Sequence, residues 1–500
     1  MAHVGGGRRR GRGWQRLAAA CLLAAAPACT GRLANQEAFP ATVSTPSTTT
    51  SIVPTTAPPT TFAGPAPYGA TVEGLLTFRG NPTRTYYGKG PVPEAPVVLN
   101  RFPDEAMCSE SVEGGQTVRW CGTGWTGQPA VVERKGRTWV IFGAYDGAVH
   151  FLDAATGRRL LPDFPTGDII KGSVTVDPDG YPLVYVGSRD DNLRVLAIDR
   201  PAPTELWRLH ANAAGPILWN NDWDGSPLVL DDHLIEGGEN SRLHIVKLNR
   251  EYDAAGQVTV RPELAFSAPG WDAELLEALG DTEVSIEGSV ALSGSTLYFA
   301  NSGGLVQGWD ISGLGDGREP TRTFRFWTGD DTDATVVVDD EGMLYVASEW
   351  ERRTDRARQV GQILKLDPRR ADPVVWAVAD QEEVRGVAGV WATPALYRDL
   401  VIVPTNGGRL LGLDRRTGTQ RWMKQLSGPT WQSPVVVDGV LIQGDCSGAL
   451  RAYDLADTRV DPPLLWTVRL GGCIESTPAV WEGRIHVGTR DGFFVTLGDQ

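Results

Sequence analysis

The sequence lacks the short motifs that mark most catalytic and metal-binding chains. It contains no Gly-x-Ser-x-Gly elbow, no phosphate loop of the Gly-x-x-x-x-Gly-Lys type and no pair of adjacent cysteines. Histidine is scarce as well, with six in 500 residues. Five of them are scattered without the spacing of zinc ligands: His150, His210, His233, His244 and His486. We therefore predict no catalytic residue and no metal site.

Positive charge is also in short supply. Lysine and arginine number 47 against 61 aspartates and glutamates, which gives a net charge of −14. An acidic protein repels the phosphate backbone of DNA and RNA, so nucleic acid is not an expected partner.

Long apolar runs are missing except near the N-terminus. There a basic segment (residues 8–16) precedes about a dozen apolar residues and then Ala26-Pro27-Ala28-Cys29, which is typical of an export signal too short to span a membrane. We predict a signal peptide over residues 1–28 and lipidation of Cys29, as in a bacterial lipobox. The alternative is ordinary cleavage after Ala28, which would give a secreted protein.

Residues 29–70 are predicted to form a stalk behind the anchor. Thr, Ser, Pro and Ala dominate residues 42–67, and such a composition favours an extended chain because it cannot bury a core. The mature protein is thus expected to face outward from the cell membrane, which it touches through the lipid of Cys29 only.

Residues 71–500 repeat one pattern eight times. In residues 390–426, four short apolar segments are separated by turns such as Arg398-Asp399 and Asn406-Gly407, which predicts a four-stranded antiparallel sheet. Aligned on Pro394, equivalent segments begin at Pro129, Val174, Pro227, Val290, Thr335, Pro434 and Pro478. Four-stranded units of roughly 40 to 60 residues are typical of β-propellers. We predict an all-β, eight-bladed propeller.

The last unit ends at Gln500 after three strands. Residues 97–102, just before the first unit, are predicted to supply its fourth strand. Pairing of the N- and C-terminal strands would then close the ring and leave no open edge.

Four cysteines fall in the propeller, and an even number outside the cytoplasm indicates two disulfides. All four are expected on one face near the closure, because they lie in connections that enter a first strand or join a second strand to a third. The favoured pairing is Cys108 with Cys121 and Cys446 with Cys473. The alternative is reduced, buried thiols.

Two insertions interrupt the repeat. Residues 272–279 (DAELLEAL) predict a short helix with Asp272 as its cap and Gly280 as its end. Residues 351–359 are rich in arginine and predict a solvated loop.

The repeat resembles that of the PQQ-like (pyrroloquinoline quinone repeat) β-propeller family. That family carries an Ala-x-x-x-Thr-Gly-x-x-x-Trp-like segment, which residues 414–422 (DRRTGTQRW) match well, whereas Trp376 lacks the Thr-Gly. Residues 78–81 (FRGN) look like the family's lead-in. The resemblance covers about residues 75–500 and implies the fold. For function it implies either a cofactor-free scaffold, such as the outer-membrane assembly lipoprotein, or a quinoprotein dehydrogenase.

Propeller geometry gathers one residue per blade at the mouth of the central channel, three places before each aligned position. These residues are Thr126, Lys171, Asp224, Glu287, Thr332, Trp391, Trp431 and Glu475. Tryptophan, carboxylate and lysine side chains can hold a planar ligand, a cation or a polar peptide. We predict the binding site at Lys171, Asp224, Glu287, Trp391, Trp431 and Glu475. The alternative is that these groups only bond strand-end amides around a water-filled channel.

Taken together, these features predict an exported, monomeric, non-catalytic propeller that binds or scaffolds an envelope protein or a cell-wall component without a cofactor. The alternative is a dehydrogenase that uses PQQ with calcium and acts on alcohols or sugars. In that case Glu287 or Glu475 would ligate calcium, and Trp391 or Trp431 would stack on the quinone.

Overall fold

The computed structural model describes residues 66–69, 71–113, 115–125 and 127–500. The predicted signal peptide (1–28), Cys29 and most of the predicted stalk (29–70) lie outside these residues. Within the described part of the chain, no helix combines the length and the apolar character needed to cross a membrane.

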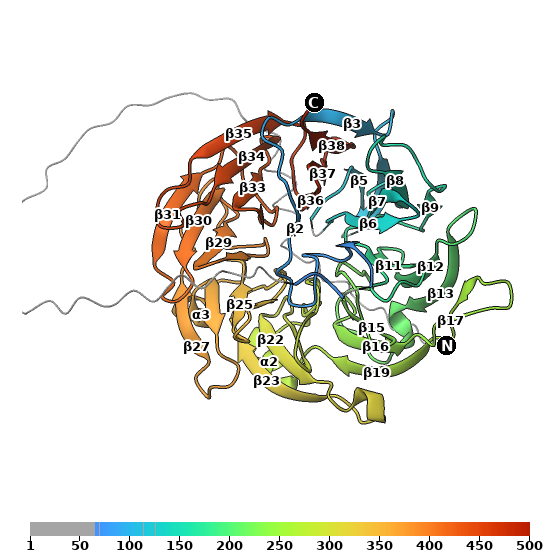
Figure 1. The fold of residues 1–500 in the computed structure, drawn as a ribbon. Helices are drawn as coiled ribbons and strands as arrows, with labels where there is room; N and C mark the ends of the chain where they lie inside the picture. Colours follow the sequence, from blue (N-terminus) through green and yellow to red (C-terminus); the bar gives the residue numbers. More distant parts are fainter. Residues whose placement is uncertain (1–65, 70, 114, 126) are drawn as a thin grey trace, which may run out of the picture. The chain divides into compact units, whose positions relative to one another are not determined.

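Eight antiparallel sheets stand around a common centre, as the repeat predicted (Figure 1). Blade 1 is β6 (Ala130–Arg134), β7 (Arg137–Gly143), β8 (Ala148–Asp153) and β9 (Phe164–Pro165); blade 2 is β10 (Thr175–Val176), β11 (Leu183–Ser188), β12 (Asn192–Ala197) and β13 (Thr204–His210). Blade 3 is β14 (Leu228–Leu230), β15 (His233–Gly238), β16 (Arg242–Lys247) and β19 (Glu263–Pro269); blade 4 is β20 (Ala291–Ser293), β21 (Thr296–Phe299), β22 (Leu305–Asp310) and β23 (Thr321–Trp327).

The remaining blades follow the same order. Blade 5 is β24 (Val337–Val338), β25 (Leu344–Ala347), β26 (Ile363–Leu366) and β27 (Val374–Val378); blade 6 is β28 (Ala395–Tyr397), β29 (Leu400–Pro404), β30 (Arg409–Asp414) and β31 (Gln420–Gln425). Blade 7 is β32 (Val435–Val437), β33 (Val440–Gly444), β34 (Ala449–Asp454) and β35 (Leu464–Arg469); blade 8 is β36 (Ala479–Trp481), β37 (Arg484–Gly488), β38 (Phe494–Gly498) and β3 (Val97–Phe102).

The ring closes as predicted, because β3 is the fourth strand of blade 8. It pairs antiparallel with β38, with Val97 opposite Gly498 and Phe102 opposite Phe494. Two short strands of the lead-in segment, which we define as residues 66–96, add to the inner edges of the sheets. β1 (Gly74–Leu75) pairs with β6 of blade 1, and β2 (Gly88–Lys89) pairs with β36 of blade 8.

The tight turns between first and second strands set the register. Lys135, Asp438 and Glu482 have φ values of 51°, 49° and 44°, and each is followed by a glycine whose φ is also positive. Two consecutive left-handed residues are the geometry of a type I′ turn, which matches the twist of paired strands.

The lead-in segment runs through the centre of the ring (Figure 1). Arg79 and Arg84 are fully buried in it. The guanidinium of Arg79 donates to the carbonyl oxygens of Pro394 and Pro434, which belong to blades 6 and 7. Arg84 donates to the carbonyl oxygens of Ser226 and Val290, at 2.9 and 2.6 Å, in blades 3 and 4. The two side chains thus satisfy inner main-chain carbonyls on opposite sides of the ring.

A second set of bonds joins neighbouring blades just outside this segment. In blades 3 to 6, the backbone N–H of the residue two places before the first strand's pairing position donates to a hydroxyl of the next blade. Ser226 donates to Ser289, Ser289 to Thr335, Thr335 to Thr393 and Thr393 to Ser433, at 2.9 to 3.1 Å. These hydroxyls satisfy strand-end amides that no ladder partner reaches.

The Thr-Gly turn of the repeat has a packing role. A Cβ on Gly418 would lie 2.8 Å from the ring of Trp376, and the indole N–H of Trp376 donates to the carbonyl of Arg415 at 3.1 Å. The outer strand of blade 5 therefore docks its tryptophan on the turn of blade 6, and only glycine allows this approach.

Short helices occupy the two insertions. α2 (Ala273–Leu279) begins at Asp272, whose side chain accepts from the N–H of Leu275, and ends at the left-handed Gly280, as predicted. The solvated loop predicted over residues 351–359 is wrong in part, because it contains α3 (Asp355–Val360) with Ala357 and Val360 buried. Further short elements are β4 (Cys108–Glu113), β5 (Gln116–Cys121), β17 (Glu251–Tyr252), β18 (Val258–Thr259), η1 (Ala211–Ala213) and η2 (Leu314–Asp316).

Both disulfides form with the favoured pairing. Cys108–Cys121 staples the β4–β5 hairpin, and Cys446–Cys473 joins the second-to-third turn of blade 7 to the start of blade 8. The alternative of reduced thiols is not what the structure shows.

Replacing Cys446 and Cys473 by serine is expected to lower the free energy of unfolding by about 2 to 4 kcal/mol, because the cross-link spans 27 residues and restricts the unfolded chain. Urea unfolding without reductant, compared with the parent, measures the loss. Equal midpoints and slopes for the two proteins would show that this bond does not stabilise the fold.

His486 on β37 gives stability a dependence on pH. It is fully buried beside the hydroxyl of Thr496, and burial, with a smaller effect of Arg484, lowers its pKa to about 3. In the unfolded chain the pKa is about 6.5, so the unfolded state binds the proton first as the pH falls. This contribution is complete above about pH 6.5 and is lost between there and pH 3.

We therefore expect the stability gap between the parent and a His486→Gln variant to move by about 1.4 kcal/mol per pH unit against the parent below pH 6.5. Urea unfolding of both proteins at neutral pH and near pH 5 measures it. A gap that does not change with pH would contradict the assignment.

Candidate functional site

The strand register identifies which residues surround the mouth of the ring. In each blade, one residue of the first strand pairs with one residue of the second strand. We follow two positions from this pair: the residue four places before the first-strand partner, and the residue four places after the second-strand partner. The pairs that fix this register are Ala130–Ile141, Thr175–Tyr185, Leu228–Ile235, Ala291–Tyr298, Val337–Tyr345, Ala395–Ile402, Val435–Ile442 and Ala479–His486. We call the two positions the pre-strand and post-strand positions.

The pre-strand positions hold the six predicted site residues. Lys171, Asp224, Glu287, Trp391, Trp431 and Glu475 all occupy them. In blade 5 the strand pairing lies one residue later than the sequence alignment predicted, so the pre-strand residue is Asp333 and not Thr332. Thr126 of blade 1 lies outside the described residues. The post-strand residues are Tyr145, Arg189, Glu239, Ser302, Glu349, Asn406, Cys446 and Arg490. Of these, the sequence predicted only Cys446, as a disulfide cysteine.

Lys171 and Asp224 meet in a buried ionic cluster. The Nζ of Lys171 lies 2.7 Å from Asp224, 3.1 Å from Glu239 and 3.2 Å from Asp222, and all four side chains are buried. Arg189 reaches Asp222 at 3.5 Å. Burial alone lowers the pKa of Lys171, but the surrounding carboxylates more than offset it and hold this pKa well above its usual value. Burial likewise raises the pKa of Asp222 to about 7, against the opposing effect of Lys171.

Three tryptophans meet at the mouth. The ring of Trp125, from the segment before blade 1, lies 5.1 Å from that of Trp391 of blade 6 and is tilted by 30°. Trp431 meets Trp391 edge to face at 6.0 Å. The indole N–H of Trp391 donates to Asp333 at 3.1 Å. Blades 1 and 6 are not neighbours, so Trp125 reaches across the mouth to cover Trp391.

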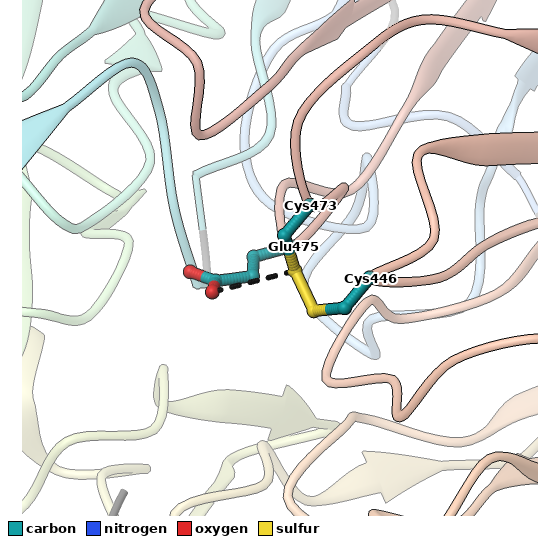
Figure 2. A group of neighbouring side chains, drawn as sticks. All are labelled: Cys446, Cys473 and Glu475. Atoms are coloured by element: carbon teal, nitrogen blue, oxygen red, sulfur yellow. Dashed lines mark hydrogen bonds between the residues drawn. A yellow bond between two sulfur atoms is a disulfide. The ribbon is translucent and has the colours of Figure 1, made fainter. Parts of the chain in front are cut away.

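Glu475 lies apart from these clusters, beside a disulfide (Figure 2). Its Oε2 accepts from Arg490 at 2.7 Å, and its Oε1 is 3.6 Å from the Sγ of Cys473. Arg490 also lies over the rings of Trp120 and Tyr145, at 5.0 and 4.8 Å. Glu475 is thus held by a cation of its own blade.

Carboxylates gather where blades 4 and 5 meet. Glu287 accepts from Ser285 at 2.7 Å and from Ser302 at 3.3 Å, and Ser302 also donates to Asp333 at 3.2 Å. Asp331 and Glu349 lie in the same region, and the backbone N–H of Glu349 donates to the carbonyl of Asp331. Burial is the main reason why the pKa values of these carboxyl groups lie well above their usual range, and their mutual repulsion adds to it.

The sequence matches one family model over residues 145–461, described as outer membrane protein assembly factor BamB. No curated protein matches this sequence. Among solved structures, a europium-containing methanol dehydrogenase is 12% identical, with a TM-score of 0.57 over 85% of this chain and 98% of that one. The quinohemoprotein alcohol dehydrogenase from Comamonas testosteroni is 14% identical, with a TM-score of 0.54 over 85% and 80%.

A computationally designed protein, Ika8, is also similar, at 14% identity and a TM-score of 0.52 over 75% of this chain and 96% of that one. At such identities the three structures show a shared fold and no shared activity.

Proposed function

This chain belongs to the PQQ-like β-propeller family described as outer membrane protein assembly factor BamB, and we propose that it is a non-catalytic, exported propeller that binds or scaffolds a protein or cell-wall component of the envelope. The observation that carries the proposal is the packing of Trp125 on Trp391 across the mouth. One face of the Trp391 ring, which could otherwise stack on a planar cofactor, packs against the protein's own side chain. Two disulfides fit an exported protein. Anchoring through a lipid on Cys29 is part of the proposal.

The mouth has the features of a recognition surface. Trp391 and Trp431 are half-buried, and the indole N–H of Trp391 donates to the carboxylate of Asp333 at 3.1 Å. A half-exposed tryptophan offers apolar area together with an N–H donor, which is why this residue is common where proteins bind one another. The acidic rim favours a partner that presents basic groups.

Site-specific photo-crosslinking in intact cells tests this proposal. A photoreactive amino acid in place of Trp431 is expected to give a defined crosslinked species. The same amino acid in place of Lys135, in the turn between β6 and β7 at the other end of blade 1, serves as the control and is expected to give none. Equal crosslinking at both positions, or none at Trp431, would refute a binding role for the mouth.

The second candidate is a dehydrogenase that uses PQQ with calcium and acts on alcohols or sugars. The carboxylates between blades 4 and 5 are suitable calcium ligands. Two of the residues named for the quinone site are already engaged, because Trp125 packs on Trp391 and Arg490 holds Glu475, and the sequence has no adjacent cysteines. Reduction of an electron-acceptor dye by alcohols or sugars, after incubation with PQQ and Ca²⁺, would favour this candidate.

A further inference from the structure

A pocket of about 560 Å³ lies between blades 1 and 2, at the end of the ring opposite the mouth. Residues 71–73 of the lead-in segment form one wall, residues 132–135 at the end of β6 form a second, and the first strand and first turn of blade 2 form the third. The floor is apolar, because Val132, Val176 and Ile198 line it and each is at most 4% exposed. The volume falls within the range of about 300 to 1,000 Å³ that small-molecule sites occupy.

The repeat explains why this space is open. Arg134 is the last residue of β6 before a two-residue turn, and the equivalent residues of blades 6 and 8 are Tyr397 and Trp481. Both of these aromatic side chains reach the next blade. The hydroxyl of Tyr397 lies 3.2 Å from the position that a Cβ would take on Gly439, in the first turn of blade 7. The indole N–H of Trp481 donates to Glu133 of blade 1 at 2.9 Å. Blade 1 has an arginine where these blades have an aromatic ring.

The carboxylates that line the pocket are already engaged. Asp177 pairs with Arg250 at 2.7 Å, and Glu73 pairs with Lys89. Glu133 accepts the indole N–H described above. The negative charge of this pocket is therefore compensated by groups of the protein itself.

The two cations that line the pocket, Arg134 and Lys135, form no ion pair with a described residue. Nη2 of Arg134 reaches only the carbonyl of Ile198, at 3.5 Å, and its Nε is a buried atom without a hydrogen-bond partner in the described part of the chain. The nearby carboxylate of Asp199 is held by its neighbour, because its Oδ1 lies 3.1 Å from Nε of Arg200. A partly buried guanidinium without an acceptor is costly, so the pocket favours an anion.

We propose that this pocket binds a small organic anion, with a carboxylate head on Arg134 and Lys135 and an apolar body on Val132, Val176 and Ile198. A guanidinium can bind a carboxylate through two parallel N–H donors, which fixes the orientation of the head. The anion takes, between blades 1 and 2, the space that aromatic side chains take between other blades. This site is separate from the mouth and does not depend on the proposed binding function.

Fluorescence titration with anilinonaphthalene sulfonate tests the pocket, because this probe joins an anionic head to an apolar aromatic body. Emission of the probe in the presence of the purified full chain is expected to saturate at one probe per chain. Octanoate, an apolar chain with a carboxylate, is expected to displace the probe. Octylammonium, which has the same chain and the opposite charge, is not. Absence of saturable emission, or equal displacement by the two compounds, would overturn the proposal.

Removal of both cations should remove the affinity for the probe. The double variant Arg134→Gln, Lys135→Glu is expected to weaken probe binding by at least about tenfold. Glutamate suits the turn, because Glu482 holds the equivalent position in blade 8 with a φ of 44°, close to the 51° of Lys135. Arg137→Gln is the matched control, since Arg137 follows the same turn, is 61% exposed and does not line the pocket. Undiminished binding in the double variant, or an equal loss in Arg137→Gln, would contradict the assignment.

A second variant uses the comparison between blades. Arg134→Tyr gives blade 1 the residue that blade 6 has at Tyr397, so its ring is expected to fill the pocket. Probe binding should then be abolished, with a melting temperature equal to that of the parent or higher. Probe binding that persists in this folded variant would show that the probe lies elsewhere and would overturn the proposal.

Discussion

Replacing Arg84 by methionine is expected to lower the free energy of unfolding by about 3 to 5 kcal/mol. Arg84 is fully buried and donates to the carbonyls of Phe78, Ser226 and Val290. Methionine fills a similar volume without donors, so these buried carbonyls would lose their partners. Burial lowers the pKa of this guanidinium to about 10, against the opposing effect of Glu236, and it stays charged at neutral pH.

Urea unfolding followed by tryptophan fluorescence measures the effect of Arg84→Met. Arg261→Met is the control, since the side chain of Arg261 is 74% exposed and should contribute within about 0.5 kcal/mol. A loss below about 1 kcal/mol for Arg84→Met would mean that the lead-in segment does not stabilise the ring from within.

The second large effect is expected at Lys171. Its replacement by methionine leaves Asp222, Asp224 and Glu239 buried around a missing cation, with Arg189 near one of them. Breaking a buried ion pair by removing one partner costs about 3 to 5 kcal/mol, because the remaining charge is not compensated.

The loss of unfolding free energy caused by Lys171→Met should depend on pH in a defined direction. Lys171 has a raised pKa and stays charged throughout, while Asp222, with a pKa of about 7, takes up a proton as the pH falls. Protonation relieves the repulsion in the variant, so the gap to the parent is expected to be larger near pH 8 than near pH 5. Lys247→Met, at an exposed strand end, serves as the control. A gap that is the same at both pH values would contradict the assigned charges.

Much of the fold could be predicted because it repeats. Residues 97–102 were expected to close blade 8 from the missing fourth strand alone, and β3 has these bounds. The connections placed all four cysteines on one face near the closure, and the pairing favoured among them is the one observed. The fold of blade 5 was predicted with its register shifted by one residue, because Thr335 and Val336 are both β-formers and only strand pairing shows that Asp333 takes the place of Thr332.

The side-chain contacts at the centre and mouth of the ring could not be predicted. Arg79 and Arg84 bond to main-chain carbonyls of four distant blades, and such acceptors leave no mark in the sequence. The contact between Trp125 and Trp391 joins blades that are not neighbours, so the repeat pattern carries no information about it. The post-strand residues could have been found, since they recur at a fixed distance from each second strand. The residue type at this position differs from blade to blade, however, as at Tyr145, Arg189 and Glu349, so the sequence shows no recurring motif there.

The central claim, that the mouth is a binding surface and not a quinone site, is tested most directly by calorimetric titration of the purified full chain with PQQ. Ca²⁺ is kept at one concentration in cell and syringe, so that only the quinone can release heat. We predict no saturable binding to the parent, because Trp125 covers Trp391. Saturable binding with a dissociation constant at or below about 1 μM would contradict the account and assign the chain to the dehydrogenases.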